Sequence, residues 1–543
     1  MDATKTFNSA EFVTPLSISR SLLSTSISTL LFFALSFAVL YFVAHAVYQS
    51  FFSPLAALPG PWYSAISDFW LTTHVVRFQQ CRIVQALFDK YGPVVRVGPN
   101  KVAFCNATTM RSVYCVHKFD KSSYYKSLLT NNNDHAMTTL PHAEHAVRRK
   151  AYSSHYIPSN LALFQTDLQD LCLKLVDTLG RTFGSTPVDC LDLFRHLMVD
   201  IIGTTVFGRL PGSLDNWAKN IQDPLATAVY DFPKRGVMRS AVPTWAWNLV
   251  CLIPNNRLRQ VCDSDRIMAQ FVAGRLYEMR TNLQAGPVGG GTDTEKLPLL
   301  QRMLLHRVFA TNECMPDKDI ISEGMGHLVA GVDTSSTTLS YLLWELSRRA
   351  DIAKRLQAEL DEAMPDRAVI PDAVALTKLP YLNAFIKEGL RLYGAAPSLL
   401  ERVVSSTSPS GLDDSFDLMG YAVPPGTIVS TQAWSMHRDA SVFPSPETFL
   451  PERWLAVDGV DGEDERLAMM NQHMVPFGVG SRLCGGHALA QLVMRMVIAV
   501  VARNLNITAD VTQTNERSME MRDAFVLFPA AKECKLIFNA RKN

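Results

Sequence analysis

The most constraining feature of this chain is a glycine-rich string of ten residues near its C-terminal end, residues 477–486 (FGVGSRLCGG). The glycines at 478, 480 and 486 allow the backbone to press closely against a flat group. Cys484 stands just before an apolar helical pattern at residues 487–500, and amides at a helix N-terminus stabilise a thiolate. A thiolate among backbone N–H groups suits iron as a single strong ligand. The string therefore predicts a loop that holds iron through Cys484.

Zinc is the alternative metal at this loop. Cys484 and His487 have a CxxH spacing, and His473 lies upstream. A structural zinc site needs four protein ligands, and no second cysteine lies nearby. The ten cysteines are scattered without a CxxC pair. They predict mostly buried free thiols in a reducing compartment rather than a disulfide framework.

Helical patterns dominate the remainder of the chain. A protein of 543 residues with 48% apolar and 19% charged residues can bury a large core and is not disordered. The net charge of +1 gives no support for nucleic acid as a partner. The patterns predict one mainly α domain with a minor β-sheet. Helices are expected at about 160–206, 256–284, 316–349, 351–365 and 375–393, a β-hairpin at 91–105, a strand at 423–432, and loops at 286–295 and 405–414.

An uncharged apolar run at residues 26–48 is long enough to cross a bilayer as a helix. A cleaved signal peptide is the alternative, but its apolar core spans only about 7–15 residues. We therefore expect a tail at 1–25, a transmembrane anchor at 26–48, a proline-rich hinge at 49–62 and the catalytic domain at 63–543. The few flanking basic residues do not orient the anchor.

A second unusual string, residues 330–335 (AGVDTS), interrupts a long helical pattern with glycine, aspartate and small hydroxyl residues. Such residues have a low propensity for the interior of a helix. A functional explanation competes with a tolerated kink.

The string at 477–486 resembles the haem-binding loop of the cytochrome P450 superfamily, with Cys484 at the position of the axial iron ligand. The resemblance implies the cytochrome P450 fold, haem b as cofactor, and Phe477 and Arg482 among the haem contacts. The order of anchor, hinge and motifs is similar to that of eukaryotic microsomal members. The style of the hinge is similar to that of fungal secondary-metabolism enzymes.

The same resemblance gives residues 330–335 the role of an oxygen-binding groove. Gly331 would leave room for dioxygen, and Thr334 would donate a hydrogen bond to it. Asp333 would relay protons from solvent. This is the acid–alcohol pair that the family uses to deliver protons.

Glu388 and Arg391 are spaced i, i+3 and share a helix face. They could form an exposed pair worth about 0–1 kcal/mol. The resemblance implies instead a buried triad with Arg453, which serves folding and haem retention.

His145 and Arg149 are spaced i, i+4, which suits two donors to one carboxylate. A solvated helix face is the alternative. The resemblance implies a haem propionate as their partner, with Arg402 and Arg482 as further donors. Many members of the family have tryptophan where His145 stands.

Taken together, the resemblance implies a monooxygenase that inserts one oxygen atom from O2 into a hydrophobic small molecule such as a terpenoid or polyketide. Its electrons would come from NADPH through a separate NADPH–cytochrome P450 reductase, with cytochrome b5 as an optional donor. The chain would be anchored in the endoplasmic reticulum membrane with a cytosolic catalytic domain. Two alternatives stay open: a haem-thiolate isomerase or dehydratase that needs no reductase, and a haem sensor or scaffold without catalysis.

Overall fold

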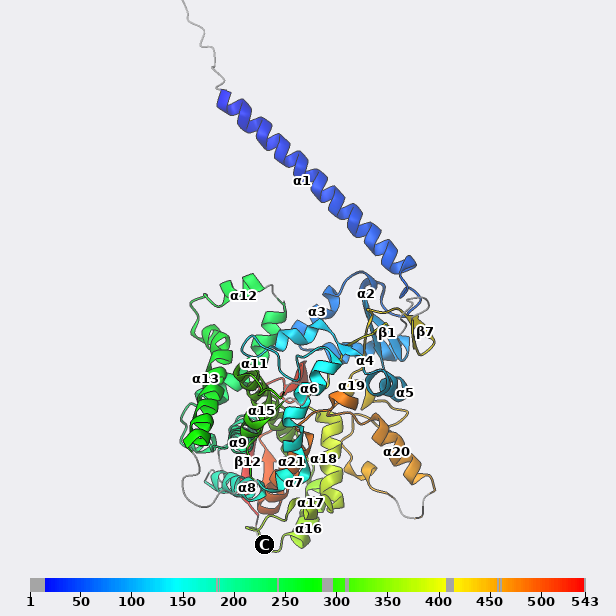
Figure 1. The fold of residues 1–543 in the computed structure, drawn as a ribbon. Helices are drawn as coiled ribbons and strands as arrows, with labels where there is room; N and C mark the ends of the chain where they lie inside the picture. Colours follow the sequence, from blue (N-terminus) through cyan, green and yellow to red (C-terminus); the bar gives the residue numbers. More distant parts are fainter. Residues whose placement is uncertain are drawn as a thin grey trace, which may run out of the picture.

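The body of the molecule is organised around one long helix, α15 (Asp317–Arg348), seen in the computed structural model in Figure 1. This model describes residues 15–181, 184, 186–241, 244–285, 296–307, 312–406, 415–456, 459 and 461–541. The helix starts directly after Pro316, and Asp317 and Asp319 place negative charge in its first turn. It packs against α9 (Cys190–Phe207), α13 (Asn256–Ala285), α18 (Pro380–Tyr393) and α21 (His487–Asn504).

Burial explains why these helices hold together. Along α9 nearly every side chain is buried, and the larger part of α15 is buried as well. A helix that is covered on all sides belongs to the core of a large domain. The other α-helices are α2 (Trp62–Ile66), α3 (Phe69–Val76), α4 (Gln80–Tyr91), α5 (Ala107–Arg111), α6 (His142–Ser153), α7 (Pro158–Ala162), α8 (Gln165–Gly180), α10 (Ser213–Ala218), α11 (Pro224–Ala241), α12 (Thr244–Val250), α14 (Leu299–Leu305), α16 (Ala350–Ala363), α17 (Ala373–Thr377), α19 (Ala433–Met436) and α20 (Glu463–His473).

The sheets are small and lie at the margins of the helical core. The largest has the strand order β1-β2-β8-β5-β3 and joins chain segments that are far apart in sequence. Its strands are β1 (Val94–Gly98), β2 (Lys101–Phe104), β3 (Asp120–Lys121), β5 (Arg402–Val403) and β8 (Ile428–Ser430). The others are β4 (Val188–Asp189), β9 (Leu505–Ala509) and β12 (Lys535–Ala540), the pair β10 (Met521–Ala524) and β11 (Val526–Pro529), and the pair β6 (Phe416–Leu418) and β7 (Tyr421–Val423).

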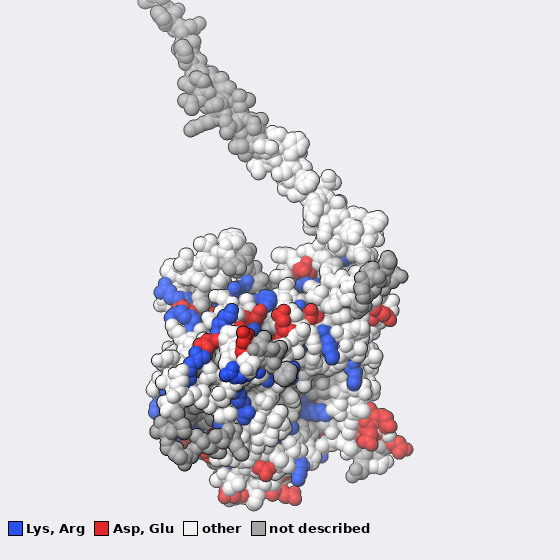
Figure 2. Space-filling view, in the orientation of Figure 1, with Lys and Arg blue, Asp and Glu red and all other residues white. Residues whose placement is uncertain are grey.

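The N-terminal helix α1 (Pro15–Val47) projects away from the body (Figure 1). The apolar segment Thr29–Phe52 is long enough to span a membrane and none of its most apolar window is buried. Its described surface carries no charged side chains (Figure 2). Buried Arg96 ties the following connector to the body, because it donates from Nη1 to the Gln49 carbonyl at 2.7 Å and its backbone N–H bonds the Pro59 carbonyl at 2.8 Å.

Most of the expected elements are present. The mainly α architecture and the hairpin at 91–105 are confirmed, since β1 and β2 pair antiparallel. One continuous helix over 160–206 was wrong: α8 ends at Gly180, and β4 precedes α9, because β4 pairs with β12 from the far end of the chain. The strand expected at 423–432 is shorter, since the turn before it extends to Thr427. The loop at 286–295 and most of that at 405–414 lie outside the described residues.

Candidate functional site

The loop that carries Cys484 is shaped by its own backbone. The Cys484 N–H donates to the Phe477 carbonyl at 2.9 Å, which closes the loop just before α21. Gly480 has a φ of 72°, and a Cβ there would lie 2.4 Å from the Tyr114 carbonyl oxygen. Only glycine fits this left-handed turn against a neighbouring backbone. The glycine therefore presses the loop onto the segment around Tyr114 and sets the position of Cys484.

The Cys484 side chain borders a space inside the fold. It is exposed on its loop, yet burial raises the pKa of its thiol. The backbone amides of Gly486 and His487 and the charge of Arg149 act in the opposite direction and lower that pKa. A cationic metal at the sulfur would tip this balance to the thiolate.

The two histidines near this loop each hold one ring nitrogen at a backbone carbonyl. The His487 Nδ1 atom lies 2.9 Å from the Cys484 carbonyl oxygen, and the His473 Nδ1 atom lies 2.9 Å from the Met469 carbonyl oxygen. These bonds do not use Nε2 of either ring, so the number of ligands that come together decides between the metals. Within the described ranges, no group of three or more His, Cys, Asp or Glu side chains is placed to hold a metal ion.

The string at 330–335 forms a polar interruption in the middle of α15. The Thr334 hydroxyl donates to the Ala330 carbonyl at 2.6 Å, one turn earlier. Ala330 is exposed and Thr334 is half-buried, although Val332, Asp333 and Ser335 beside them are buried. This strip of core helix therefore faces a hollow rather than a packed neighbour. A Cβ at Gly485, next to Cys484, would lie 2.8 Å from the Tyr152 ring, and this ring packs edge-on against His327, one turn before Ala330 and Gly331. The strip and Cys484 therefore lie on either side of Tyr152.

Gly331 lies where α9 and α15 approach each other. A Cβ at this position would lie 2.5 Å from Ile202 Cδ1 and 2.9 Å from Ile202 Cγ1. Its missing side chain therefore lets the two helices pack closely, and its role toward dioxygen stays a prediction. The exposed backbone beside Thr334 belongs to Ala330 instead.

Asp333 turns away from Thr334 and meets an arginine of α9. The Arg195 Nε atom donates to Asp333 Oδ1 at 3.2 Å, and both side chains are buried. Burial raises the pKa of Asp333, and the Arg195 charge opposes that rise. Arg195 also lines a cavity of about 220 Å³, together with His196 and Tyr230. Arg195 was not singled out in the sequence, and it connects Asp333 to this cavity.

Four basic side chains gather near the loop and form what we call the cationic cluster: Lys121, His145, Arg402 and Arg482. Lys121 of β3 and Arg402 of β5 are paired residues in the sheet, where like charges opposite each other are destabilising. All but Arg482 are buried. Burial and the neighbouring charges lower the pKa of His145 to about 3, that of Arg482 to about 10 and that of Lys121 well below its usual value.

Two polar atoms of the cationic cluster have no hydrogen-bond partner among the described residues: His145 Nδ1 and Arg482 Nε. A buried group of positive charges with free donors needs an anion. The two propionates of a haem would meet these donors while its iron meets Cys484. The residues present therefore fit a haem.

Arg149 lies close to the cationic cluster but is used differently. Its Nη1 donates to the Ser481 carbonyl at 3.0 Å and to the Leu483 carbonyl at 2.7 Å. These bonds bind α6 to the Cys484 loop. Arg149 thus braces the loop, and the alternative of a solvated helix face is wrong for Arg149 and for buried His145.

Glu388, Arg391 and Arg453 meet as a buried ion-pair triad. The Glu388 carboxylate accepts from Arg391 Nη2 at 2.8 Å, Arg391 Nε at 2.9 Å and Arg453 Nε at 3.0 Å. It also accepts from the Leu450 N–H and the Trp454 indole N–H, both at 2.9 Å. Every lone pair of this carboxylate is engaged, as a buried charge requires.

His437 joins the triad to the Cys484 loop and was missed in the sequence. Its Nδ1 lies 3.0 Å from the Arg391 carbonyl oxygen, and its Nε2 accepts from the Val475 N–H at 2.9 Å. Burial lowers the pKa of His437 to about 3, so the ring is neutral and can donate from Nδ1 while it accepts at Nε2. The triad thereby positions the first residues of the loop.

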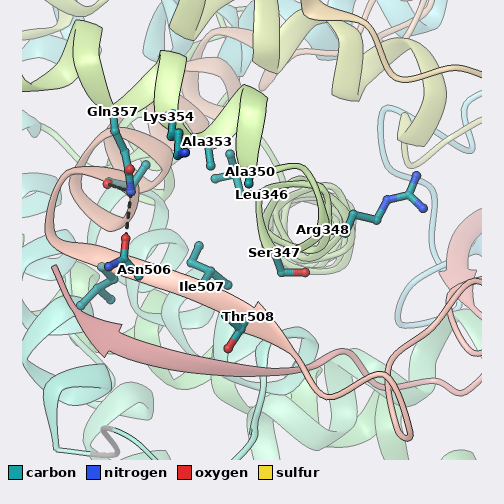
Figure 3. Close-up of a pocket in the computed structure, with 12 residues that line it drawn as sticks. Leu346, Ser347, Arg348, Ala350, Ala353, Lys354, Gln357, Asn506, Ile507 and Thr508 are labelled. Carbon is teal, nitrogen blue, oxygen red and sulfur yellow. Dashed lines mark hydrogen bonds between the residues drawn. The ribbon is translucent and has the colours of Figure 1, made fainter.

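A separate cavity of about 270 Å³ lies at the C-terminal end of α15, between α16, α21 and β9 (Figure 3). Gln357 donates to the Asn506 side chain at 3.4 Å across one side of it. The residues of the Cys484 loop and of 330–335 do not line this cavity. It is therefore a feature apart from the candidate site.

Comparisons with known proteins agree with this geometry. The family described as Cytochrome P450 matches residues 59–536. Cytochrome P450 monooxygenase cypX of Dothistroma septosporum is 26% identical over 92% of this chain and 94% of its own length. Fusicoccadiene C-8 hydroxylase of Alternaria brassicicola is 28% identical over 93% and 94%. Tryprostatin B 6-hydroxylase of Aspergillus fumigatus is 26% identical over 89% and 80%.

Proposed function

The chain belongs to the cytochrome P450 family and is a monooxygenase, and on this premise we propose that it oxidises a hydrophobic secondary metabolite. In the proposed reaction one atom of O2 enters the substrate and the other leaves as water. NADPH supplies the two electrons through a separate reductase. The observation that supports the proposal is that Tyr152 contacts both the Cys484 loop at Gly485 and His327 of α15, one turn before the strip at Ala330 and Thr334.

The chemistry supplied by a bound haem is the activation of dioxygen and the insertion of one oxygen atom into the substrate. Cys484 would hold the iron, and the cationic cluster would hold the propionates. The hydroxyl of Thr334 is placed to donate or accept a proton in the hollow, because its only bond in the described chain is to the Ala330 carbonyl. Asp333 would take up protons from the Arg195 side, where the cavity lined by His196 and Tyr230 lies.

The proposed substrate is a terpenoid or a polyketide. Val329 and Leu400 are half-buried and apolar on segments that flank the hollow in this family. Two relatives carry hydroxylase names, one for fusicoccadiene and one for tryprostatin B. Apolar side chains such as these suit apolar molecules.

The proposed electron donor is NADPH–cytochrome P450 reductase, with cytochrome b5 as a second donor. Lys150 of α6 is exposed near the Cys484 loop and could meet an acidic partner. Arg148 is less suited, because it is engaged with Asp319 at 3.5 Å and Glu323 at 3.7 Å.

The experiment that tests the function is product analysis in microsomes that contain the full chain and a reductase. Candidate terpenoids and polyketides are supplied with NADPH and labelled O2. Transfer of one labelled oxygen atom into product is the expected result. Turnover without NADPH would favour the isomerase or dehydratase, and a haem-loaded protein without any product from the panel would favour the sensor.

We also propose that the body rests on the cytosolic face of the endoplasmic reticulum membrane. The helices α2, α3 and α12 lie at the end of the body from which α1 leaves (Figure 1). These helices and the residues just after α12 carry exposed apolar side chains: Trp62, Phe69, Trp245 and Leu252. Apolar patches of this kind mark membrane contacts. Protection of residues 63–543 from protease added to intact microsomes would contradict this orientation.

Thr334→Ala is expected to uncouple NADPH oxidation from product formation. Without the Thr334 hydroxyl, no side chain beside Ala330 positions the proton that the reaction needs. Reduced oxygen then leaves as hydrogen peroxide. Product per NADPH should fall several-fold while NADPH oxidation continues.

The matched control for Thr334 is Ser336→Ala, since the Ser336 hydroxyl makes the same bond one turn back, to Val332, on a buried face of α15. Peroxide and product are measured together in both variants. Unchanged coupling in Thr334→Ala, or equal loss in Ser336→Ala, would remove Thr334 from this role.

Arg195→Gln is expected to destabilise the protein more at neutral than at acid pH. Asp333 has a pKa raised by burial, and Arg195 is the main group that opposes the rise, with Lys234 helping and Asp231 acting against it. The folded state then binds the Asp333 proton more tightly than the unfolded state, whose pKa is about 3.9. The free energy of unfolding therefore falls as pH rises from about 4 to the pKa of Asp333 in the folded state. The variant raises that folded-state pKa, so its free energy of unfolding keeps falling to a higher pH.

The measurement is the difference in Tm between wild type and Arg195→Gln near pH 4 and near pH 7. The deficit should be larger near pH 7, and a second change, Asp333→Asn, should remove this pH dependence. A deficit that is equal at both pH values would show that Asp333 does not titrate against Arg195.

A further inference from the structure

Two cysteines meet at the junction of α12 and α13, away from the Cys484 site. The Cys251 and Cys262 sulfur atoms lie 2.9 Å apart, within hydrogen-bond distance, and no disulfide bond joins them. Cys251 comes directly after α12, and Cys262 lies in the second turn of α13. A disulfide needs a separation of about 2.05 Å, so a shift of less than about 1 Å brings the two atoms into bonding range. Both are half-buried and can be reached from solvent.

A buried arginine faces this pair. Arg235 of α11 is buried, and its Nε and Nη1 atoms have no hydrogen-bond partner among the described residues. Its one ion pair is from Nη2 to Asp265, at 3.5 Å. Burial lowers the pKa of Arg235, while Asp265 and the two cysteines oppose this, so both sulfurs lie close enough to interact with the guanidinium. A guanidinium with free donors beside a thiol favours the thiolate, the reactive form.

The two thiols are not equivalent. Burial and the neighbouring Cys251 raise the pKa of Cys262 to about 12, with Arg235 opposing the rise. Cys262 therefore keeps its proton, and its sulfur lies 2.9 Å from that of Cys251. This assigns Cys251 as the attacking sulfur and Cys262 as the resolving one.

We propose that Cys251 and Cys262 form a reversible dithiol–disulfide couple that is oxidised by hydrogen peroxide. The Cys251 thiolate attacks one peroxide oxygen, the O–O bond breaks, and a proton completes the water that leaves, giving a sulfenic acid. The Cys262 sulfur then attacks the Cys251 sulfur, and the S–OH bond breaks with release of a second water. The two thiols lose two electrons and two protons, and one peroxide becomes two waters. A small thiol such as glutathione reverses the bond by exchange.

The bond would act as a tether. Residues 252–261 form a short connection between the two sulfurs, and exposed Trp245 and Leu249 on α12 precede it. Oxidation would fix the end of α12 against α13. A peroxide-producing monooxygenase would supply the oxidant locally, and this source alone rests on the proposed function. The couple itself is tested with added peroxide, so its failure is distinguishable from a failure of that function.

The test is differential alkylation of the full-length haem-loaded protein before and after hydrogen peroxide, followed by digestion with trypsin. Trypsin cuts after Arg257 and Arg259, so the bond would join the peptides 240–257 and 260–266. We expect this linked pair, loss of alkylation at both cysteines together, and full recovery with dithiothreitol. Hydrogen exchange at residues 245–255 should slow after oxidation, and unchanged exchange would overturn the tether.

Three comparisons make the result decisive. Cys251→Ser and Cys262→Ser should each abolish the linked pair, whereas Cys314→Ser, at an exposed cysteine elsewhere, should leave it unchanged. The buried neighbours Cys190 and Cys534 should stay reduced, because burial raises the pKa of the Cys190 thiol well above its usual value. Unchanged alkylation of Cys251 and Cys262 under conditions that oxidise Cys314 would overturn the proposal. Sulfonic acid at Cys251 without a link would also overturn it.

Discussion

Cys484→Ala is expected to reduce monooxygenase activity to background. The variant removes the sulfur that would hold the iron, while the bond to the Phe477 carbonyl that closes the loop comes from the backbone and remains. The reduced protein with carbon monoxide should lose the Soret position that marks a thiolate ligand. Haem content, measured as the pyridine haemochrome, should fall as well, because one of its holding groups is gone.

The control for Cys484→Ala is Cys115→Ala. The Cys115 sulfur lies beside the same loop, since a Cβ at Gly480 would lie 3.2 Å from it. This variant removes a thiol next to the loop but not the one that faces the hollow, so its spectrum and activity should resemble wild type. A carbon monoxide spectrum of Cys484→Ala at the wild-type position would refute Cys484 as the ligand.

The parts of this site that follow a local pattern could be predicted from the sequence. The Cys484 loop needs glycine where the backbone touches Tyr114, and that requirement is visible in ten consecutive residues. The pair Glu388 and Arg391 is visible as an i, i+3 spacing on α18. The hairpin at 91–105 combines alternation with turn residues.

The parts that depend on distant segments could not be predicted in this way. Lys121 and Arg402 are 281 positions apart and meet only because β3 pairs with β5. Arg195 faces Asp333 because α9 and α15 pack through Ile202 at Gly331. No spacing in the sequence signals such contacts.

The surroundings of Gly331 depend on distant segments as well. Glycine in the string 330–335 is visible as an opening in α15, but the sequence does not say which way the opening faces. The helix turns by about 100° per residue, so Gly331 faces α9 while Ala330 borders the hollow. Similarly, β4 interrupts the helical pattern at 160–206 because its partner β12 lies near the end of the chain.

Glu388→Ala is expected to destabilise the protein by about 3–5 kcal/mol and to prevent stable haem incorporation. The change leaves the Arg391 and Arg453 guanidiniums buried without the carboxylate that both of them bind. It also weakens the contacts by which Arg391 positions His437, and His437 in turn binds the backbone of Val475, just before the Cys484 loop. Structural loss and haem loss should therefore appear together.

The measurements for Glu388→Ala are the midpoint of denaturant unfolding and the ratio of haem to protein after expression with ample haem supply. The matched control is Asp177→Ala on α8, where an exposed i, i+4 pair with Arg181 is removed. Such a pair is worth about 0–1 kcal/mol, so this control should keep its haem and its unfolding midpoint. If Glu388→Ala retained haem as fully as Asp177→Ala, the triad would stabilise the protein no more than an exposed ion pair does, despite its burial. Loss of haem in Glu388→Ala alone would instead show that the buried triad of Glu388, Arg391 and Arg453 stabilises the Cys484 loop.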